Sequence, residues 1–373
     1  MRFLIISHTP HIQINDALYA YTPYVREMNI WLKHVDTVEI VAPKINQSVS
    51  NIELPYKHDK IHFNKTPSIA FISVKKSLES LIKIPIIFST IFKACKKADH
   101  IHLRCPGNIG LLGCLVQICF PKKIKTAKYA GNWDSKSKQP LSYRLQKRIL
   151  SNIFLTKNMQ VLVYGNWENQ TRNIKPFFTA SFNDSEIEIP KERNYDSKLN
   201  FVFIGTLVKG KRPLFAIKLV ELLKKEGKNV FLECYGDGVL KEELQEYITK
   251  NNLEDIVDLK GNQDASVIKK TLKKSHFLIL ASKSEGWPKA IAEAMFFGTI
   301  PIATKISCVP FMLDYGKRGI LIDENLDTSV HQIKNHLKDE SRLKSMSKNA
   351  SNWSQNYTLE AFEKEIVKLL KPQ

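Results

Sequence analysis

Two glutamates, Glu285 and Glu293, are the residues whose spacing most restricts the chemistry of this chain. They lie in the segment SKSEGWPKAIAEAMFFGTIPI (282–302). A pair of carboxylates can act as acid and base, or as acid and nucleophile, on a glycosidic bond when the two groups are about 5 to 9.5 Å apart. Residues eight positions apart on one helix are separated by roughly 12 Å of rise. We therefore expect the two to hold different parts of one elongated ligand. The alternative is that Glu285 is only a first-turn acid favoured by the helix dipole and that Glu293 is a solvated helix residue.

The elements around the two glutamates predict a parallel βαβ unit. HFLILAS (276–282) and IPIAT (300–304) are apolar runs of strand length, and AIAEAMFF (290–297) between them has the length of a crossover helix. The loop after the first strand then lies at the carboxyl end of a parallel sheet, where ligands bind in doubly wound folds. Free backbone N–H groups near Trp287 and Lys289, at the start of the helix, favour an anion such as phosphate.

The composition suits a soluble protein of two domains. The chain has 373 residues, of which 43% are hydrophobic and 25% charged. Its first ten residues resemble a strand more than a secretory signal. The longest apolar stretches, 84–92 and 109–120, are too short to span a bilayer. Six cysteines without a C-x-x-C spacing favour reduced, buried thiols in a cytoplasm over disulfides or zinc.

The excess of positive charge belongs to the first half. Residues 1–180 hold 26 Lys and Arg against 10 Asp and Glu, a net of +16, whereas residues 181–373 hold 30 against 27, a net of +3. Such a field favours a phospholipid surface, a lipid pyrophosphate or nucleic acid, unless it is only a solvated face. The basic amphipathic stretch at 74–97 is a candidate for an anionic membrane surface or, alternatively, a surface helix with an apolar core face.

Strand and helix patterns alternate in two sets, which predicts an α/β protein with two Rossmann-like domains. The first set begins at residue 3, and the second runs from FVFIGTL (201–207) to GILID (319–323). Between them, residues 181–198 are polar and lack periodicity, which is typical of a linker. Residues 351–371 have apolar positions at helical spacing, which predicts a closing helix.

The residues that flank the two glutamates carry a resemblance to a known family. The segment has, in this order, Glu285-Gly286-Trp287, then Glu293-Ala294-Met295, and then Gly298 followed by Pro301. In these residues and their order it resembles the donor-site motif of the retaining glycosyltransferases of family 4. These are glycosyl transferases of group 1, and the segment is similar to theirs. The resemblance implies a catalytic-site contact of Glu285 with donor-sugar hydroxyls and a contact of Glu293 with the ribose of a sugar nucleotide.

The resemblance also implies a GT-B fold, in which two Rossmann-like doubly wound parallel-sheet domains face each other across a cleft. The expected parts are an acceptor-binding domain (1–182), a linker (183–199), a nucleotide-sugar-binding domain (200–350) and a C-terminal helix that crosses back to the first domain (351–373).

A second donor-site loop follows the strand at 201–207. The family has Gly-Arg-Leu and then a Lys six residues after the Gly; here Gly205 and Lys211 keep that spacing, but Thr206 replaces the Arg. The resemblance implies that Lys211 neutralises the leaving diphosphate as a catalytic residue. Arg212 or Lys209 would then supply the missing cation. A loop lysine outside such a context is usually only solvated.

Further donor-binding positions implied by the resemblance share a place at strand ends or in the motif loop. They are Gly236, Lys260, Gly286, Trp287 and Lys289. Ordinary turn chemistry is the alternative for the glycines.

In the first half, HIHLRCPGN (100–108) ends a predicted strand. His102 is the better match to the family's catalytic-site histidine, and Arg104 lies on the same face of the strand. The alternative for His102 is a hydrogen-bonded structural residue. His8 could line the acceptor side, although its loop lacks the family's paired glycines. Trp133 could either stack on a sugar or pack under its own loop.

The predicted function is transfer of a hexose-type residue, with retention, from a nucleotide diphosphate sugar to a saccharide or a polyprenyl-phosphate-linked acceptor in cell-surface polysaccharide or glycolipid synthesis. No Asp-x-Asp motif occurs, so neither a metal nor a cofactor is expected, and no nucleic-acid partner is expected either. The expected location is the cytoplasm, or the inner face of the plasma membrane. Competing hypotheses are a sugar-nucleotide epimerase of the same fold and a non-catalytic protein that binds anionic lipid or nucleic acid.

Overall fold

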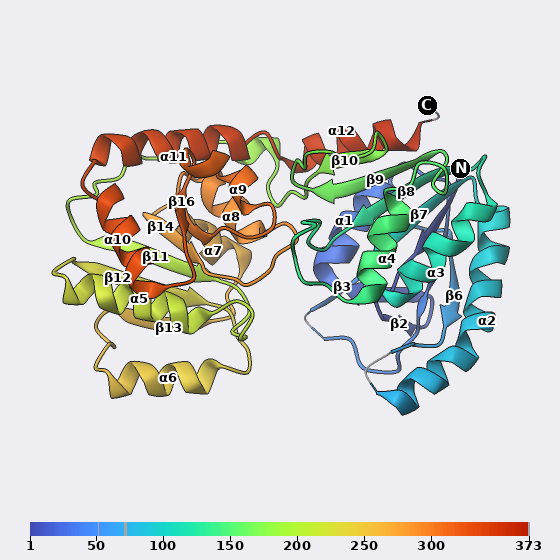
Figure 1. Cartoon of the computed structure of the whole chain (residues 1–373), viewed down its shortest axis with the longest axis horizontal. Helices are drawn as coiled ribbons and strands as arrows, with labels where there is room; N and C mark the ends of the chain where they lie inside the picture. Colours follow the sequence, from blue (N-terminus) through green and yellow to red (C-terminus); the bar gives the residue numbers. More distant parts are fainter. Residues whose placement is uncertain (51, 71–72, 372–373) are drawn as a thin grey trace. The chain divides into compact units, whose positions relative to one another are not determined.

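The computed structural model describes residues 1–50, 52–70 and 73–371, and the chain divides into two compact units. The first unit comprises Met1–Phe178 with Phe362–Gln373, and the second Thr179–Ala361. Each unit has its own parallel sheet with helices packed on it (Figure 1). This confirms the predicted fold class of two Rossmann-like doubly wound domains.

The sheet of the first unit has the order β10-β9-β8-β7-β1-β4-β6, and its neighbouring strands are parallel. From β1 the chain moves outward through β4 to β6 and then returns to the other side of β1 with β7. The loops after β1 and β7 therefore border the point where the strand order reverses, the usual ligand position in such sheets. The strands are β1 (Arg2–Ile6), β4 (Thr37–Pro43), β6 (Ile61–Thr66), β7 (His100–Cys105), β8 (Ile124–Tyr129), β9 (Met159–Tyr164) and β10 (Ile174–Phe177).

Helices and a small antiparallel sheet complete the first unit. The small sheet has the order β2-β3-β5; β2 and β3 follow β1, where no strand was predicted, and β5 follows β4. Its strands are β2 (His11–Ile14), β3 (Ala17–Tyr21) and β5 (Glu53–Pro55). The helices are α1 (Thr22–Leu32), α2 (Val74–Lys97), α3 (Asn108–Val116), η1 (Gln117–Cys119), α4 (Leu141–Leu150) and α12 (Leu359–Leu370), which joins this unit from Phe362 onward.

The sheet of the second unit has the order β13-β12-β11-β14-β15-β16, again with parallel neighbours. The order reverses between β11 and β14. The strands are β11 (Leu199–Ile204), β12 (Val230–Tyr235), β13 (Val257–Gly261), β14 (Phe277–Leu280), β15 (Ile300–Thr304) and β16 (Ile320–Ile322). The helices are η2 (Asp184–Glu186), α5 (Pro213–Lys225), α6 (Lys241–Lys250), α7 (Ala265–Leu272), α8 (Lys289–Phe296), α9 (Val309–Met312), η3 (Asp314–Gly316), α10 (Leu326–His336) and α11 (Glu340–Ser354).

The polar segment expected as a linker at 183–199 packs on the second unit along much of its length. The buried guanidinium of Arg193 donates hydrogen bonds to the carbonyls of Phe297 at 2.8 Å and Gly298 at 2.9 Å. Glu186 forms an ion pair of 2.8 Å with Lys269. Polar side chains of this segment therefore bond to backbone carbonyls and to a surface lysine of the second unit, and are not all simply hydrated.

The closing segment contains a break that its apolar spacing did not predict. Residues 351–371 were expected to be helical, whereas α11 ends at Ser354 and α12 begins at Leu359. The N–H of Leu359 bonds to the carbonyl of Phe182, at 2.9 Å. Both helices keep apolar side chains buried.

Candidate functional site

The reversal point of the second sheet brings Lys211 and Glu285 together. Lys211 lies in the loop after β11 and Glu285 in the loop after β14, and these two strands are neighbours. The Lys211 Nζ is 2.5 Å from the Glu285 Oε1, and the side chains are 32% and 9% exposed. The N–H of Lys283 also bonds to the carbonyl of Gly210, at 2.9 Å, so the two loops are joined by backbone as well. Two predicted site residues far apart in sequence thus form one ion pair.

The loop that carries Glu285 is held by the next strand along the sheet. The N–H of Glu285 donates to the Ser307 Oγ at 3.1 Å, and the Cys308 thiol donates to the carbonyl of Gly286 at 3.1 Å. Burial raises the pKa of Cys308 to about 12, so the thiol keeps its proton and remains a donor. The backbone on both sides of the Glu285 side chain is therefore held in place by these two hydrogen bonds. The sequence analysis missed Ser307 and Cys308, although their place just after a strand of the same sheet was a usable signal.

Helix α8 begins just after Pro288, which is its N-cap residue. The N–H of Ile291 bonds to the carbonyl of Pro288, at 3.0 Å. The N–H groups of Lys289 and Ala290 precede this bond, so they have no acceptor within the helix, as is usual at a helix start. Such a helix start favours an anion, through its free N–H groups and its dipole.

Glu293 lies further along α8 and has a different partner from Glu285. Its Oε1 accepts a hydrogen bond of 2.6 Å from the hydroxyl of Ser181. The two glutamates therefore hold separate positions on the second unit.

Two glycines let the loops after β11 and β12 approach closely. The N–H of Gly205 bonds to the carbonyl of Tyr235 at 3.0 Å, and that of Gly236 to the carbonyl of Gly261 at 2.9 Å. Gly236 has a φ of 131°, and a Cβ added there would lie 2.0 Å from the carbonyl oxygen of Gly205. Only glycine fits this position.

The cations Arg212 and Lys260 are engaged elsewhere in the second unit. The Arg212 guanidinium donates to the carbonyl of Glu324 at 3.1 Å and lies 4.5 Å from the centre of the Phe215 ring. Lys260 forms an ion pair with Asp258. Among the described contacts, neither cation touches the Lys211–Glu285 pair.

Trp287 packs into an aromatic cluster and anchors the motif loop. It is 7% exposed, and its ring centre lies 6.1 Å from that of Trp353 and 5.8 Å from that of Tyr357. These contacts attach the loop to the end of α11. The neighbouring Lys289 is half-buried at the first position of α8.

In the first unit, His102 lies in the interior of β7. It is 1% exposed, its Nδ1 is 2.8 Å from the Thr126 Oγ1, and its ring centre is 4.7 Å from that of Trp31 and 5.6 Å from that of Phe3. Burial lowers the pKa of His102 well below 6.5, which keeps the ring neutral. These are the contacts of a hydrogen-bonded structural histidine, the alternative raised from the sequence.

Arg104 lies further along β7 and forms an ion pair of 2.9 Å with Glu27. Its guanidinium also lies 5.2 Å from the centre of the Tyr24 ring. Burial alone would lower the pKa of Arg104, but the Glu27 carboxylate outweighs it and the pKa is raised. The guanidinium is therefore charged and oriented from two sides.

His8 lies at the reversal point of the first sheet, directly after β1. It packs against Gly107 in the loop after β7, where an added Cβ would lie 2.6 Å from the Cβ of His8. Burial lowers the pKa of His8, and its buried Nδ1 has no hydrogen-bond partner among the described residues. A neutral imidazole with one unused nitrogen thus lies where ligands bind in this class of sheet.

Trp133 packs beneath its loop, the second of its two predicted roles. It is 4% exposed, its Nε1 donates to the Gln170 Oε1 at 3.0 Å, and its ring centre lies 4.9 Å from that of Tyr129. The Lys147 ammonium lies 5.3 Å from the centre of the same ring. The indole is therefore enclosed on several sides.

No three His, Cys, Asp or Glu side chains in residues 1–50, 52–70 and 73–371 gather as they would around a metal ion. Within the same ranges, no helix combines the length and the apolar character needed to cross a membrane.

Comparisons with known proteins agree with this geometry. Residues 184–353 match the family described as glycosyl transferases group 1. The chain is 28% identical over 291 residues to protein CapJ of Staphylococcus aureus, covering 74% of this chain and 72% of CapJ. It is 30% identical over 194 residues to the uncharacterized glycosyltransferase MJ1059 of Methanocaldococcus jannaschii, covering 48% of this chain and 42% of that protein.

Solved structures of glycosyltransferases share the fold over the whole chain. The lipopolysaccharide outer core galactosyltransferase WaaB has a TM-score of 0.68 at 16% identity, and each chain is covered to 99%. The HepE protein of Anabaena, solved with UDP and glucose, has a TM-score of 0.66 at 13% identity over 99% of both chains. The chain is therefore a glycosyltransferase of the GT-B fold, and its residues 184–353 form a glycosyl transferases group 1 domain.

Proposed function

We propose that the chain transfers a hexose-type residue from a nucleotide diphosphate sugar to a saccharide or polyprenyl-phosphate-linked acceptor, with retention of anomeric configuration, as family 4 enzymes do. The observation that carries this proposal is the Lys211–Glu285 ion pair at the reversal point of the second sheet. A cation and a carboxylate held 2.5 Å apart there can serve the two chemically different ends of the donor's reactive bond. The diphosphate needs positive charge, and the sugar needs a hydrogen-bond acceptor.

In the proposed reaction, the bond between the anomeric carbon and the diphosphate oxygen breaks, and its electron pair goes to the diphosphate. Lys211 and the first N–H groups of α8 stabilise the charge that develops there. Glu285 accepts hydrogen bonds from the sugar hydroxyls while the anomeric carbon gains oxocarbenium character, and Glu293 holds the ribose. The acceptor oxygen then bonds to the anomeric carbon on the same face. Its proton passes to the leaving phosphate.

The names of relatives support the class of donor and the pathway. HepE was solved with UDP and glucose, and a relative 28% identical over 133 residues is the putative colanic acid biosynthesis glycosyltransferase WcaL of Salmonella typhimurium. We propose a UDP-sugar as the first donor to test and cell-surface polysaccharide or glycolipid synthesis as the pathway.

On the acceptor side, we propose that His8 meets the substrate and that the interior His102 has a supporting role. The unused Nδ1 of His8 supports the first assignment, and the 1% exposure of His102 supports the second. Arg104, charged and held by Glu27, would bind a phosphate or carboxylate of the acceptor.

The central experiment measures donor binding and turnover together. Thermal unfolding is recorded with UDP-, GDP- and ADP-sugars, because a specific donor stabilises the folded state by mass action. Donor hydrolysis is then compared for wild type, Glu285→Gln and the control Glu242→Gln, an exposed residue of α6. Stabilisation by one donor and loss of hydrolysis only in Glu285→Gln are expected. Absence of stabilisation by every donor would contradict the proposal, and an epimerised sugar among the products would favour the rival epimerase.

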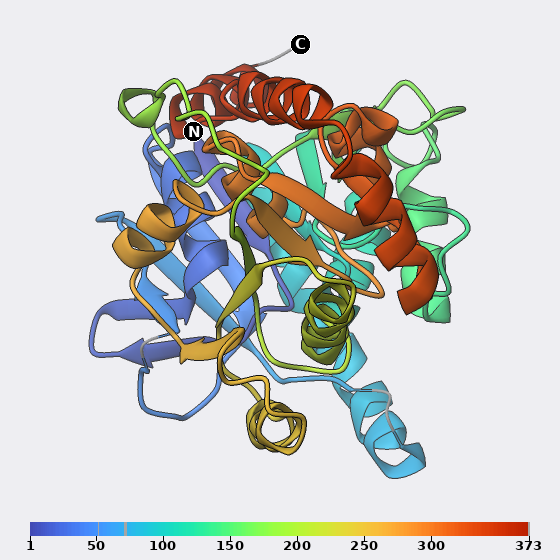
Figure 2. The ribbon, with the colours of Figure 1, turned by 90° about the vertical axis from the view of Figure 1, so that its left-hand side faces the viewer.

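We also propose that α2 places the enzyme on an anionic membrane surface. One end of this helix projects beyond the first unit's sheet in both views (Figures 1 and 2). Apolar side chains on it are exposed, and lysines follow them toward its end; the side chains of residues 74–77 lie outside the described part. The exposed fractions are 59% for Leu78, 54% for Leu81, 77% for Ile82 and 63% for Ile86.

Sedimentation with phosphatidylglycerol vesicles tests this location. Ile82→Glu with Ile86→Glu should abolish co-sedimentation, since charges would replace the apolar face that inserts into the headgroup region. Folding of the variant is checked by its thermal unfolding curve. Unchanged co-sedimentation would show that α2 is only a surface helix.

A further inference from the structure

A cavity of about 840 Å³ opens in the first unit, at the edge of the sheet where β8, β9 and β10 begin. Its wall includes Ile124 and Lys125 at the start of β8 and Met159 and Gln160 at the start of β9. Since strands of a parallel sheet run in one direction, this edge is opposite the carboxyl ends that His8 and Gly107 follow. The cavity is therefore separate from the candidate acceptor side.

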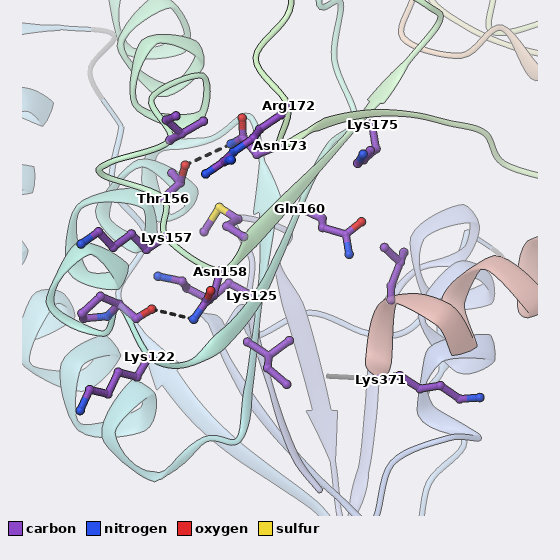
Figure 3. Close-up of a pocket in the computed structure, with 15 residues that line it drawn as sticks. Lys122, Lys125, Thr156, Lys157, Asn158, Gln160, Arg172, Asn173, Lys175 and Lys371 are labelled. Carbon is purple, nitrogen blue, oxygen red and sulfur yellow. Dashed lines mark hydrogen bonds between the residues drawn. The ribbon is translucent and has the colours of Figure 1, made fainter. Parts of the chain in front are cut away.

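The cavity wall is strongly basic. None of the residues that line it is acidic, whereas six of them are lysine or arginine. Figure 3 shows these cations around the space, from Lys122 and Lys157 on one side to Lys371, beyond the end of α12, on the other. The six are Lys122, Lys125, Lys157, Arg172, Lys175 and Lys371.

One of the six has internal partners. Lys125 is 1% exposed, and its ammonium donates hydrogen bonds to the carbonyls of Gln117 at 3.3 Å and Phe120 at 3.1 Å. Burial lowers the pKa of Lys125 to about 8. The other five side chains are exposed and have no ion pair or hydrogen bond among the described residues.

The frame that carries these cations is fixed by hydrogen bonds of neighbouring amides. The Asn158 Nδ2 donates to the carbonyl of Pro121 at 3.1 Å, and the Asn173 Nδ2 donates to the Thr156 Oγ1 at 3.1 Å, as the dashed lines in Figure 3 mark. The first bond joins the loop before β9 to the loop before β8, and the second joins the residue before β10 to the loop before β9. Five like charges on a fixed frame repel one another, and a multivalent anion would relieve that repulsion.

We propose that this cavity binds a ligand with two or more phosphate charges, at a site separate from the donor and acceptor sites. The cation count suits a pyrophosphate-type group, because several ammonium groups and one guanidinium can surround it from different elements. Apolar side chains in the same wall, Ile153 and Leu369 among them, would contact an attached apolar portion. Such a group can come from a soluble phosphorylated metabolite or from the headgroup of an anionic lipid.

The test is calorimetric titration of the full chain with inorganic pyrophosphate. It uses the Lys211→Ala background, which weakens the contribution of the donor site, and the comparison with the control variant removes what remains. Lys157→Ala with Arg172→Ala should weaken binding about tenfold, because each partly exposed charge contact contributes about 0.7 kcal/mol. The charge-matched control is Lys228→Ala with Lys250→Ala, two exposed lysines of the second unit, and it should leave the affinity within twofold of its background.

Vesicles of cardiolipin, whose headgroup carries two phosphates, with phosphatidylcholine vesicles as the neutral reference, distinguish the two sources. Loss of pyrophosphate binding alone in the Lys157/Arg172 variant indicates a soluble ligand, and parallel loss of vesicle binding indicates a lipid headgroup. The proposal is overturned if pyrophosphate does not bind the Lys211→Ala protein, or if the pocket variant and the control bind it equally. Donor turnover does not enter this readout, so the result is independent of the proposed function.

Discussion

Replacing Glu285 by glutamine should separate the two halves of the proposed donor site. The substitution keeps the shape of the side chain and removes its charge, so the Lys211 ammonium loses its carboxylate partner at 2.5 Å. An exposed ion pair contributes about 0–1 kcal/mol, whereas removing one partner of a buried pair costs about 3–5 kcal/mol. The charge left behind is on Lys211, which is 32% exposed and can be hydrated. We therefore expect a loss of about 1 kcal/mol, or about 2–4 °C in Tm for a unit of this size.

The effect on catalysis should be larger than the effect on stability. A hydrogen bond from a sugar hydroxyl to a carboxylate contributes about 1.5–3 kcal/mol, which corresponds to about 10- to 150-fold in kcat/KM. The affinity for the free nucleoside diphosphate should stay within about threefold of wild type, because that ligand has no sugar for Glu285 to bind. Lys211→Met should show the converse pattern, with weaker binding of the nucleoside diphosphate.

Donor hydrolysis measured against donor concentration, together with calorimetric titration of the nucleoside diphosphate, gives both quantities. Circular dichroism and Tm establish that each variant is folded. The division of roles would be refuted if Glu285→Gln weakened the nucleoside diphosphate as strongly as Lys211→Met. Wild-type turnover in a folded Glu285→Gln protein would remove Glu285 from the mechanism altogether.

Three further outcomes are expected. Gly236→Ala should lower the Tm and weaken donor binding, since its Cβ would lie 2.0 Å from the Gly205 carbonyl oxygen, whereas Gly227→Ala, with nothing within 4 Å, should cost only about 1 kcal/mol of backbone strain. Activity should persist in excess EDTA, because Lys211 supplies the positive charge at the diphosphate; loss that Mg²⁺ restores would contradict this. Burial lowers the pKa of His100 from 6.5 to about 4. Between these pH values the unfolded chain binds a proton at this residue that the folded chain does not bind. The shift of His100 should therefore lower the free energy of unfolding by about 3 kcal/mol as the pH drops from about 6.5 to 4. In urea unfolding, His100→Gln should show a smaller fall over that range than wild type does.

The order of strands and helices could be predicted from the sequence because the strands of both sheets are short apolar runs. The segment HFLILAS, for example, contains β14, and IPIAT is β15. The small sheet β2-β3-β5 could not be predicted, because its strands are short and β5 pairs with β3 from far along the chain. The hydrogen bonds of the segment 183–199 could not be predicted for a similar reason, since the carbonyl partners of Arg193 lie about a hundred residues away in the sequence.

The proximity of two candidate site residues could be predicted where the order of the strands fixes it. Lys211 and Glu285 meet because they follow neighbouring strands at a reversal point, a relation that follows from strand order. Whether a side chain faces the interior or a ligand could not be predicted in the same way. His102 and Trp287 have the residue types of a site, but burial and aromatic packing give both of them internal contacts. Alternation along a strand does not distinguish a buried face from a ligand face when both faces of the sheet are covered.

Arg212 and Lys209 are the two candidates for the cation that would replace the arginine that the family has at the position of Thr206, and their contacts favour Lys209. Arg212 is held by Glu324, and moving it toward the diphosphate would break those contacts. Lys209 is exposed in the same loop and has no ion pair or hydrogen bond from its side chain among the described residues. The Lys211 ammonium has three N–H groups, so it can keep Glu285 and still bind a phosphate oxygen. Because Glu285 offsets part of the Lys211 charge, we propose that Lys209 supplies a second cation to the diphosphate, which it can do without breaking a contact among the described residues.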